Sequence, residues 1–322
     1  MYRITVIAVA AALILNSFAS AQGGVAATVN GVPIQQIALD RALDQVDAAD
    51  REKATTEFLD FLIDNALVDQ YLVQQQVKVE QKEIDARLGE LKQDMEKKGQ
   101  TYDKVLAKLK MPESEFVTMV ANDLRWEKFA QAQCTDANLK ALFEKHLDMF
   151  DGSQMRARHI LLNPGADAQA QEAAKATLLE IRRQIEATAN AAAAKLPPSA
   201  DNTTREQERQ KQVEIAFADF AKAKSTCPSK KDGGDLNWFP RVGHMVEPFA
   251  AAAFALKPYE MSQPIHTQFG YHLILCTGRK PGQEIKFDDV KEEVKEIYCN
   301  RLREAIVAHM KQSAKIVVTP RK

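Results

Sequence analysis

The sequence predicts an α+β fold in which a middle segment, residues 153–280, is inserted into a helical module. Three observations predict it. From residue 34 to about residue 150 the apolar residues recur every three or four positions, which is the period of helices. At Met155–Leu162 this pattern changes to an alternation that is typical of a strand. After Pro281-Gly282 the helical period returns, so the segment 281–322 is expected to complete the module.

Residues 1–21 have the features of a secretory signal peptide. Arg3 supplies positive charge, Ile4–Leu15 is apolar, and Ala19-Ser20-Ala21 has the small residues of a cleavage site. The apolar run is shorter than the roughly 18 residues that a membrane-spanning helix needs. We therefore expect an extracytoplasmic, periplasmic protein that begins at Gln22 and has no stable membrane insertion after cleavage.

Composition excludes several classes of function. The chain has 322 residues with 43 basic and 44 acidic side chains, so no bulk charge favours nucleic acid as a partner. The four cysteines lack the Cys-x-x-Cys spacing of a structural zinc site. We expect neither a metal nor a cofactor.

The N-terminal part of the module, residues 22–152, begins with a strand and continues as helices. Val25–Asn30 is strand-like and ends in an Asn30-Gly31 turn. Periodicity and capping residues then predict helices over 34–46, 51–77, 80–98, 102–109 and 112–132, with another from Asp136. A final helix over 290–310 and a strand at Ile316–Val318 close the chain, and we expect the two terminal strands to pair.

The middle segment alternates helices and strands. Its predicted elements are a strand at Met155–Leu162, helices at 168–194, 217–223 and 249–256, a strand after Gly233-Gly234, and strands at Ile265 and Tyr271–Cys276. The polar stretch at 195–210, which follows Ala191–Ala194 and contains Pro197-Pro198, is interpreted as a solvated surface loop.

Three chemically active residues lie at points that this arrangement brings together: His159 on the first strand, Cys227 on a loop, and His272 on the last strand. The simplest interpretation of each histidine is a hydrogen-bonded core residue. A cysteine hydrolase with Cys227 as nucleophile is an alternative. It is disfavoured because Pro228 follows Cys227 and two glycines come only later, unlike a nucleophile at a helix start beside an oxyanion hole.

These residues lie in motifs that resemble the parvulin family of peptidyl-prolyl isomerases. The motifs are Met155–Leu161, Cys227-Pro228-Ser229 with Gly233–Phe239, Met245–Phe249 with Ala253–Lys257, and Thr267–His272. The resemblance implies a four-stranded antiparallel sheet with helices. Residues 187–213 are longer than a minimal parvulin needs, so we expect them to be an insertion. The resemblance also implies His159 and His272 as paired histidines, Cys227 as a thiol near the imide bond, and Thr267 as a hydroxyl that supports the histidines.

The same resemblance implies that Leu236, Met245 and Phe249 line a pocket for the proline ring. Isomerisation breaks no covalent bond, so an apolar pocket that removes water from the imide is an appropriate device. Phosphate-selective parvulins carry a basic cluster after the first strand, where this sequence has Asn163–Asp167. Unmodified clients are therefore expected.

The flanking segments resemble the helical chaperone module of extracytoplasmic SurA- and PrsA-type foldases. The resemblance implies a foldase that isomerises X-Pro bonds in unfolded or partly folded exported proteins and holds them as a chaperone. An inactive holdase, which only binds such clients, is the alternative. Met95, Met111 and Met119 are either adaptable client-binding residues of this module or simply core. If the chain has a disulfide, we expect it between Cys134 and Cys299, with Cys227 unpaired.

Overall fold

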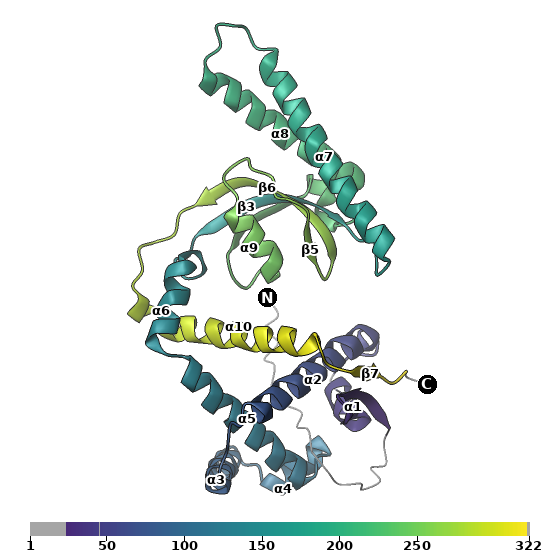
Figure 1. The fold of residues 1–322 in the computed structure, drawn as a ribbon, viewed down its shortest axis with the longest axis vertical. Coiled ribbons are helices and arrows are strands. Elements are labelled where there is room, and N and C mark those ends of the chain that lie inside the picture. The colour runs from purple at the N-terminus through teal and green to yellow at the C-terminus, as the bar shows by residue number, and fades with distance from the viewer. Residues whose placement is uncertain (1–23, 45, 321–322) are drawn as a thin grey trace. The chain divides into compact units, whose positions relative to one another are not determined.

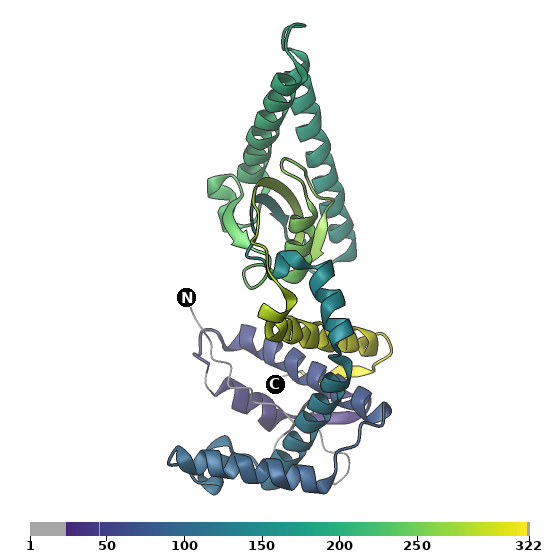
Figure 2. The same cartoon turned by 90° about the vertical axis from the view of Figure 1, so that its left-hand side faces the viewer.

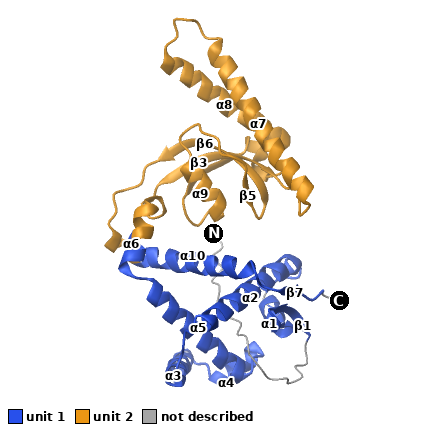
Figure 3. Ribbon diagram, in the orientation of Figure 1, with its two compact units in different colours: residues 1–140, 292–322 blue, residues 141–291 orange. Residues whose placement is uncertain are grey.

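The computed structural model describes residues 24–44 and 46–320, and it divides the chain into two compact units. Unit 1 comprises residues 1–140 and 292–322, and unit 2 comprises residues 141–291 (Figure 3). The predicted signal peptide, residues 1–21, lies outside the described residues. Unit 2 includes residues 141–152 and 281–291, which precede and follow the predicted domain in sequence. The domain boundaries expected at 152 and 280 therefore both fall inside unit 2.

A small antiparallel sheet joins the two ends of unit 1. Strand β1 (Val25–Val29) lies between β2 (Val32–Gln35) and β7 (Ile316–Val318), and Ala27 pairs with Val318. The expected pairing of the terminal strands is thus confirmed. The strand β2 was not predicted. It exists because Asn30 and Gly31 both have positive φ, 53° and 82°, which is the geometry of a tight hairpin turn.

The other regular elements in the described part of unit 1 are helices (Figures 1 and 2). They are α1 (Gln36–Leu43), α2 (Arg51–Gln74), α3 (Gln81–Lys97), α4 (Tyr102–Leu109), α5 (Glu113–Gln133) and α10 (Lys291–Lys311), while α6 (Asp136–Lys145) spans the boundary with unit 2. One apolar core joins α1, α2 and α10 to the sheet. A second joins α3, α4 and α5, and it contains Met111, with Met95 and Met119 packed against it. Met111 is therefore a core residue, whereas Met95 and Met119 are partly exposed at the edge of this core.

Unit 2 is built on a four-stranded antiparallel sheet, as expected. Its order is β4 (Asp235–Pro240), β3 (Gln154–Leu162), β6 (Gly270–Lys280) and β5 (Ile265–Thr267). Side chains alternate between the faces, so Leu273 and Leu275 of β6 pack against α7 (Ala168–Ala194) and α8 (Asn202–Lys224). Ile274 and Cys276 face the other way, in a core with α9 (Glu247–Ala255). Short 3-10 helices at Leu147–Met149, Pro228–Asp232 and Phe287–Asp289 complete the unit.

The surface loop predicted at 195–210 extends only to residue 201, and the short helix predicted at 217–223 is the last part of a much longer one. Residues 202–224 form one continuous helix, α8, which pairs with α7 as a hairpin that extends beyond the sheet (Figures 1 and 2). The Asp201 carboxylate caps α8 by accepting a hydrogen bond from the Thr204 amide at 2.7 Å. The Arg205 guanidinium donates to the carbonyls of Ala193 and Pro197 and so fixes the turn. The run is polar because it surrounds the hairpin tip, where few neighbours exclude water.

Candidate functional site

Two histidines meet on the face of the sheet that α9 covers. His159 of β3 pairs in register with Ile274 of β6, and His272 pairs with Leu161, so the histidines are diagonal neighbours on one face. Their Nδ1 atoms are 3.2 Å apart, and their rings lie 20° from parallel. Both side chains are buried, with 5% and 4% exposure.

A chain of hydrogen bonds extends from the histidine pair in both directions. The Thr267 Oγ1 atom lies 2.8 Å from His272 Nε2, and Ser229 Oγ lies 3.1 Å from His159 Nε2. The Ser229 hydroxyl in turn donates to Cys227 Sγ at 3.2 Å. The structure therefore brings together His159, His272, Thr267 and Cys227, which the sequence predicted as a cluster.

The hydrogen bond from Ser229 to Cys227 determines which atom donates in each other bond of this hydrogen-bonded series. Because Ser229 donates to Cys227, its oxygen accepts from His159 Nε2–H, which leaves the Nδ1 atom of His159 as an acceptor. His272 Nδ1–H then donates to it, and His272 Nε2 accepts from the Thr267 hydroxyl, whose oxygen accepts from the Phe269 amide at 3.1 Å. Every ring nitrogen is satisfied with both histidines neutral.

Electrostatics agree with neutral histidines. Burial lowers the pKa of His159 from 6.5 to about 4. Burial also lowers the pKa of His272 to about 4, with smaller contributions from His159 and His266. At neutral pH the pair therefore carries no charge, and it can orient its neighbours without attracting counter-ions.

The predicted pocket residues lie beside this chain. The ring of Phe249, from α9, contacts both histidine rings edge-on at centroid distances of 5.6 and 5.2 Å. Leu236 and Met245 are partly buried and pack against the same apolar core as Phe249. An apolar surface and a neutral polar chain thus share one face of the sheet.

Glycines allow the loop that carries Cys227 and Ser229 to approach β3. Gly234 has φ +78°, and its carbonyl accepts a hydrogen bond from the His159 amide at 2.9 Å. A Cβ at this position would lie 2.3 Å from the His159 carbonyl oxygen, so only glycine fits. Ser225 steadies the start of the loop, because its hydroxyl accepts from the Leu161 and Cys227 amides.

Ser229 is the member of the chain that sequence reasoning did not select. It lies two residues after Cys227, inside a motif that carried the resemblance, and that position was the available signal. Arg241 was also not selected. It is buried and forms a two-pronged ion pair with Glu247, the first residue of α9, so it holds the helix that supplies Phe249.

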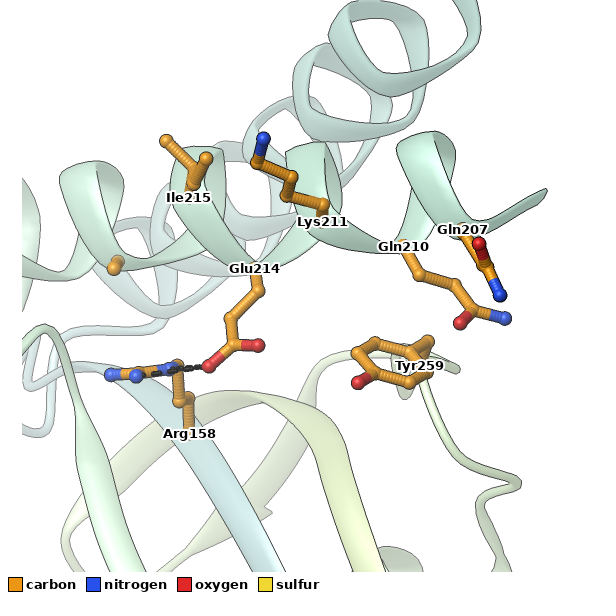
Figure 4. A pocket seen from close by; sticks show the side chains of 8 residues that line it. Arg158, Gln207, Gln210, Lys211, Glu214, Ile215 and Tyr259 are labelled. Carbon is orange, nitrogen blue, oxygen red and sulfur yellow. Dashed lines mark hydrogen bonds and ion pairs between the residues drawn. The ribbon is translucent and has the colours of Figure 1, made fainter. Parts of the chain in front are cut away.

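A separate cavity of about 430 Å³ lies on the opposite face of the sheet, between α8 and Tyr259. Figure 4 shows Gln210 directed toward the Tyr259 ring, and Glu214 paired with Arg158 at 3.1 Å. None of the predicted site residues lines it. The cavity is therefore distinct from the histidine site.

Within residues 24–44 and 46–320, no group of three or more His, Cys, Asp or Glu side chains is placed to hold a metal ion. Within the same ranges, no helix combines the length and apolarity needed to cross a bilayer.

Comparisons with known proteins agree with this architecture. The profile of the PPIC-type PPIASE domain matches residues 134–292, and that of the SurA-like N-terminal domain matches residues 1–130. The chain is 30% identical over 304 residues to foldase protein PrsA of Caldanaerobacter subterraneus subsp. tengcongensis, covering 88% of this chain and 82% of that protein.

Other relatives are similar over shorter stretches. Foldase protein PrsA of Bacillus subtilis is 31% identical over 231 residues, and the match spans 71% of this chain but 62% of that protein. Chaperone SurA of Burkholderia thailandensis is 32% identical over 130 residues, or 40% of this chain and 23% of that protein. The crystal structure of the peptidylprolyl isomerase PrsA from Bacillus anthracis covers 79% of this chain and 96% of its own, at 20% identity and a TM-score of 0.43.

Proposed function

The chain belongs to the PrsA family of foldases, with a PPIC-type domain and a SurA-like N-terminal domain, and we propose that it isomerises X-Pro bonds in exported clients and holds those clients as a chaperone. One observation carries the catalytic part of the proposal. A buried and uncharged chain of polar groups packs edge-on against Phe249, the largest side chain of the pocket.

Such a site can catalyse isomerisation without forming a covalent bond. The barrier is roughly 20 kcal/mol because rotation destroys amide resonance, and the uncatalysed step takes about 10 to 100 s. Reaching milliseconds requires about 10⁴-fold acceleration, or about 5.4 kcal/mol. An apolar pocket formed by Phe249, Leu236 and Met245 contributes by removing water from the imide, whose polarity falls as it twists.

Cys227 supplies the polar contact in this mechanism. Its sulfur accepts from Ser229, so the thiol hydrogen is available to the client, and a donor directed at the imide nitrogen weakens its resonance. The thiol attacks no carbon. Thr267, His272 and His159 position Ser229, which in turn positions Cys227.

The clients that fit are unmodified, unfolded chains outside the cytoplasm. The segment Asn163–Asp167 after β3 has no basic side chain to recognise a phosphate. The names of the relatives, foldase and chaperone, support a role in folding for both units of this chain. The predicted signal peptide supports export.

A turnover assay on a proline-containing peptide tests the proposal in the full chain. Phe249→Ala should lose about 100-fold in kcat/KM, the equivalent of roughly 3 kcal/mol for a buried aromatic. Cys227→Ser should stay within about tenfold of wild type, because serine still offers a hydrogen-bond donor. The matched control is Phe254→Ala on the same helix. Both phenylalanines contact Phe239, but the described ring contacts with His159 and His272 are made by Phe249, so Phe254→Ala should lower the melting temperature while leaving kcat/KM near wild type.

Two results would contradict the mechanism. If Cys227→Ser abolished turnover with the fold intact while Phe249→Ala retained it, covalent chemistry would have to be considered. If the wild-type chain suppressed aggregation of a denatured client but did not isomerise the peptide, the chain would be a holdase.

A further inference from the structure

Two cysteines of unit 1 meet where helices α5 and α10 come together. Cys134 is the C-terminal cap of α5, and Cys299 lies in α10. Their Sγ atoms are 3.3 Å apart although the residues are 165 positions apart in sequence. Both side chains are partly exposed, so a reagent in solvent can reach them.

We propose that Cys134 and Cys299 form a reversible disulfide that links α5 to α10, with a solvent disulfide or an oxidised dithiol protein as oxidant. The proposal does not rest on isomerase activity. One thiolate attacks the oxidant disulfide and releases one thiol, and the second thiolate then attacks the mixed disulfide and releases the other. Two electrons pass to the oxidant, whose two sulfurs take up the two protons that the cysteines lose.

The geometry requires little movement. A disulfide bond is about 2.05 Å long and the sulfurs are 3.3 Å apart, so they must approach by roughly 1.3 Å. The pKa of Cys134 is raised to about 11 by burial and by the hydrogen bond with Cys299. Since the thiolate is the attacking species, oxidation should be slow at pH 7 and faster at pH 9.

The other two cysteines are placed differently. Cys276 is fully buried in the core of unit 2, and Cys227 accepts the hydrogen bond from Ser229. Neither is recorded within bonding distance of another sulfur in the described part of the chain. The proximity therefore selects one of the six possible cysteine pairs.

The position of the pair gives the disulfide a structural role. Cys134 lies seven residues before unit 2 begins at Ala141, and Cys299 lies eight residues after unit 2 ends at Lys291. The bond would join the segment of unit 1 that leads into unit 2 to the segment of unit 1 that follows unit 2. With the bond formed, α10 stays covalently linked to α5 when unit 2 unfolds.

Trp126 is a natural reporter of this effect. It lies on α5, and the guanidinium of Arg303, from α10, lies 5.3 Å from its ring centroid. In a Trp238→Phe variant, the fluorescence of Trp126 alone follows the contact between α5 and α10. The full chain is equilibrated with oxidised or reduced glutathione and unfolded in urea.

The oxidised chain should show a midpoint about 1 M urea or more above that of the reduced chain, because a long closed loop restricts the unfolded state. A Cys299→Ser version of the reporter should show equal midpoints in both conditions. Mass spectrometry of a non-reduced digest should find the peptides of Cys134 and Cys299 linked, with Cys227 and Cys276 alkylated. Alkylation of both Cys134 and Cys299 after equilibration with oxidised glutathione, or a link to Cys227, would overturn the proposal.

Discussion

Acidification should destabilise unit 2 through its histidine pair. Burial lowers the pKa of His159 and of His272 from 6.5 to about 4, so the folded unit keeps both rings neutral at a pH where the unfolded chain protonates them. The unfolded state then binds more protons, and stability falls as the pH falls. The loss begins near pH 6.5 and is complete below about pH 4.

The size of the loss follows from these pKa values. At pH 5 each histidine costs about 2 kcal/mol of unfolding free energy relative to pH 8, and the pair costs about 4 kcal/mol. A domain of this size is stable by only about 5–15 kcal/mol, so the effect is a large fraction of the whole. Glu180 and Glu206, whose pKa values are lowered to about 2 by hydrogen bonds from arginines, contribute little above pH 5.

The measurement uses Trp238 on β4 as the reporter of unit 2, in a chain that carries Trp126→Phe. Urea titrations at pH 8 and pH 5 give the two free energies. His272→Gln should remove about half of the pH dependence. His266→Gln is the comparison on neighbouring β5, and it should change the dependence much less than His272→Gln does, because the charge of His266 is only a minor cause of the lowered pKa of His272. Equal free energies at pH 8 and pH 5 would refute the reasoning, since they would mean that the folded unit protonates the pair as readily as the unfolded chain does.

Three further outcomes are expected. Gly234→Ala should cost at least about 3 kcal/mol of unfolding free energy, because its Cβ would meet the backbone of β3. Gly243→Ala should cost only about 1–2 kcal/mol, because Gly243 has φ +88° but open space around it. Urea unfolding of the two variants measures both losses. Phe217→Ala should cost about 3–5 kcal/mol of unfolding free energy, because Phe217 is fully buried between α8 and the sheet. Ile215→Ala, at a 45% exposed site, should change the unfolding free energy by less than about 0.5 kcal/mol. Small changes for both variants would mean that residues 202–224 form a loop. Burial raises the pKa of Asp69 to about 7, so unit 1 should lose stability as the pH rises from 4 to 8, and Asp69→Asn should remove this dependence in urea titrations that follow unit 1.

Local patterns in the sequence were sufficient where burial repeats along an element. The alternation at Met155–Leu162 predicted β3, and the motif order brought His159, Cys227 and His272 to one site. The pairing of the chain ends was also predicted, because Val25–Asn30 and Ile316–Val318 are short strand-like runs at opposite ends of the segment that follows the predicted signal peptide.

The hairpin of α7 and α8 could not be predicted in the same way. Its outer part, residues 195–210, has few buried side chains, so no apolar period distinguishes a helix from a polar loop. The helix is set instead by the Asp201 cap and by local pairs such as Arg209 with Glu206, which lie 2.8 Å apart. The buried period appears only at Val213 and Phe217, where α8 reaches the sheet.

The hydrogen-bond partners of the histidines limit what they can do chemically. Both ring nitrogens of His159 and both of His272 are engaged within the protein, and neither ring is more than 5% exposed. A client therefore cannot exchange a proton with them directly, and we infer that they act as positioning residues through Ser229. The Ser229 hydroxyl joins His159, on a strand, to Cys227, on a loop. His159 and Cys227 were predicted from the sequence, whereas the contacts of Ser229 Oγ with both follow from the fold of the loop.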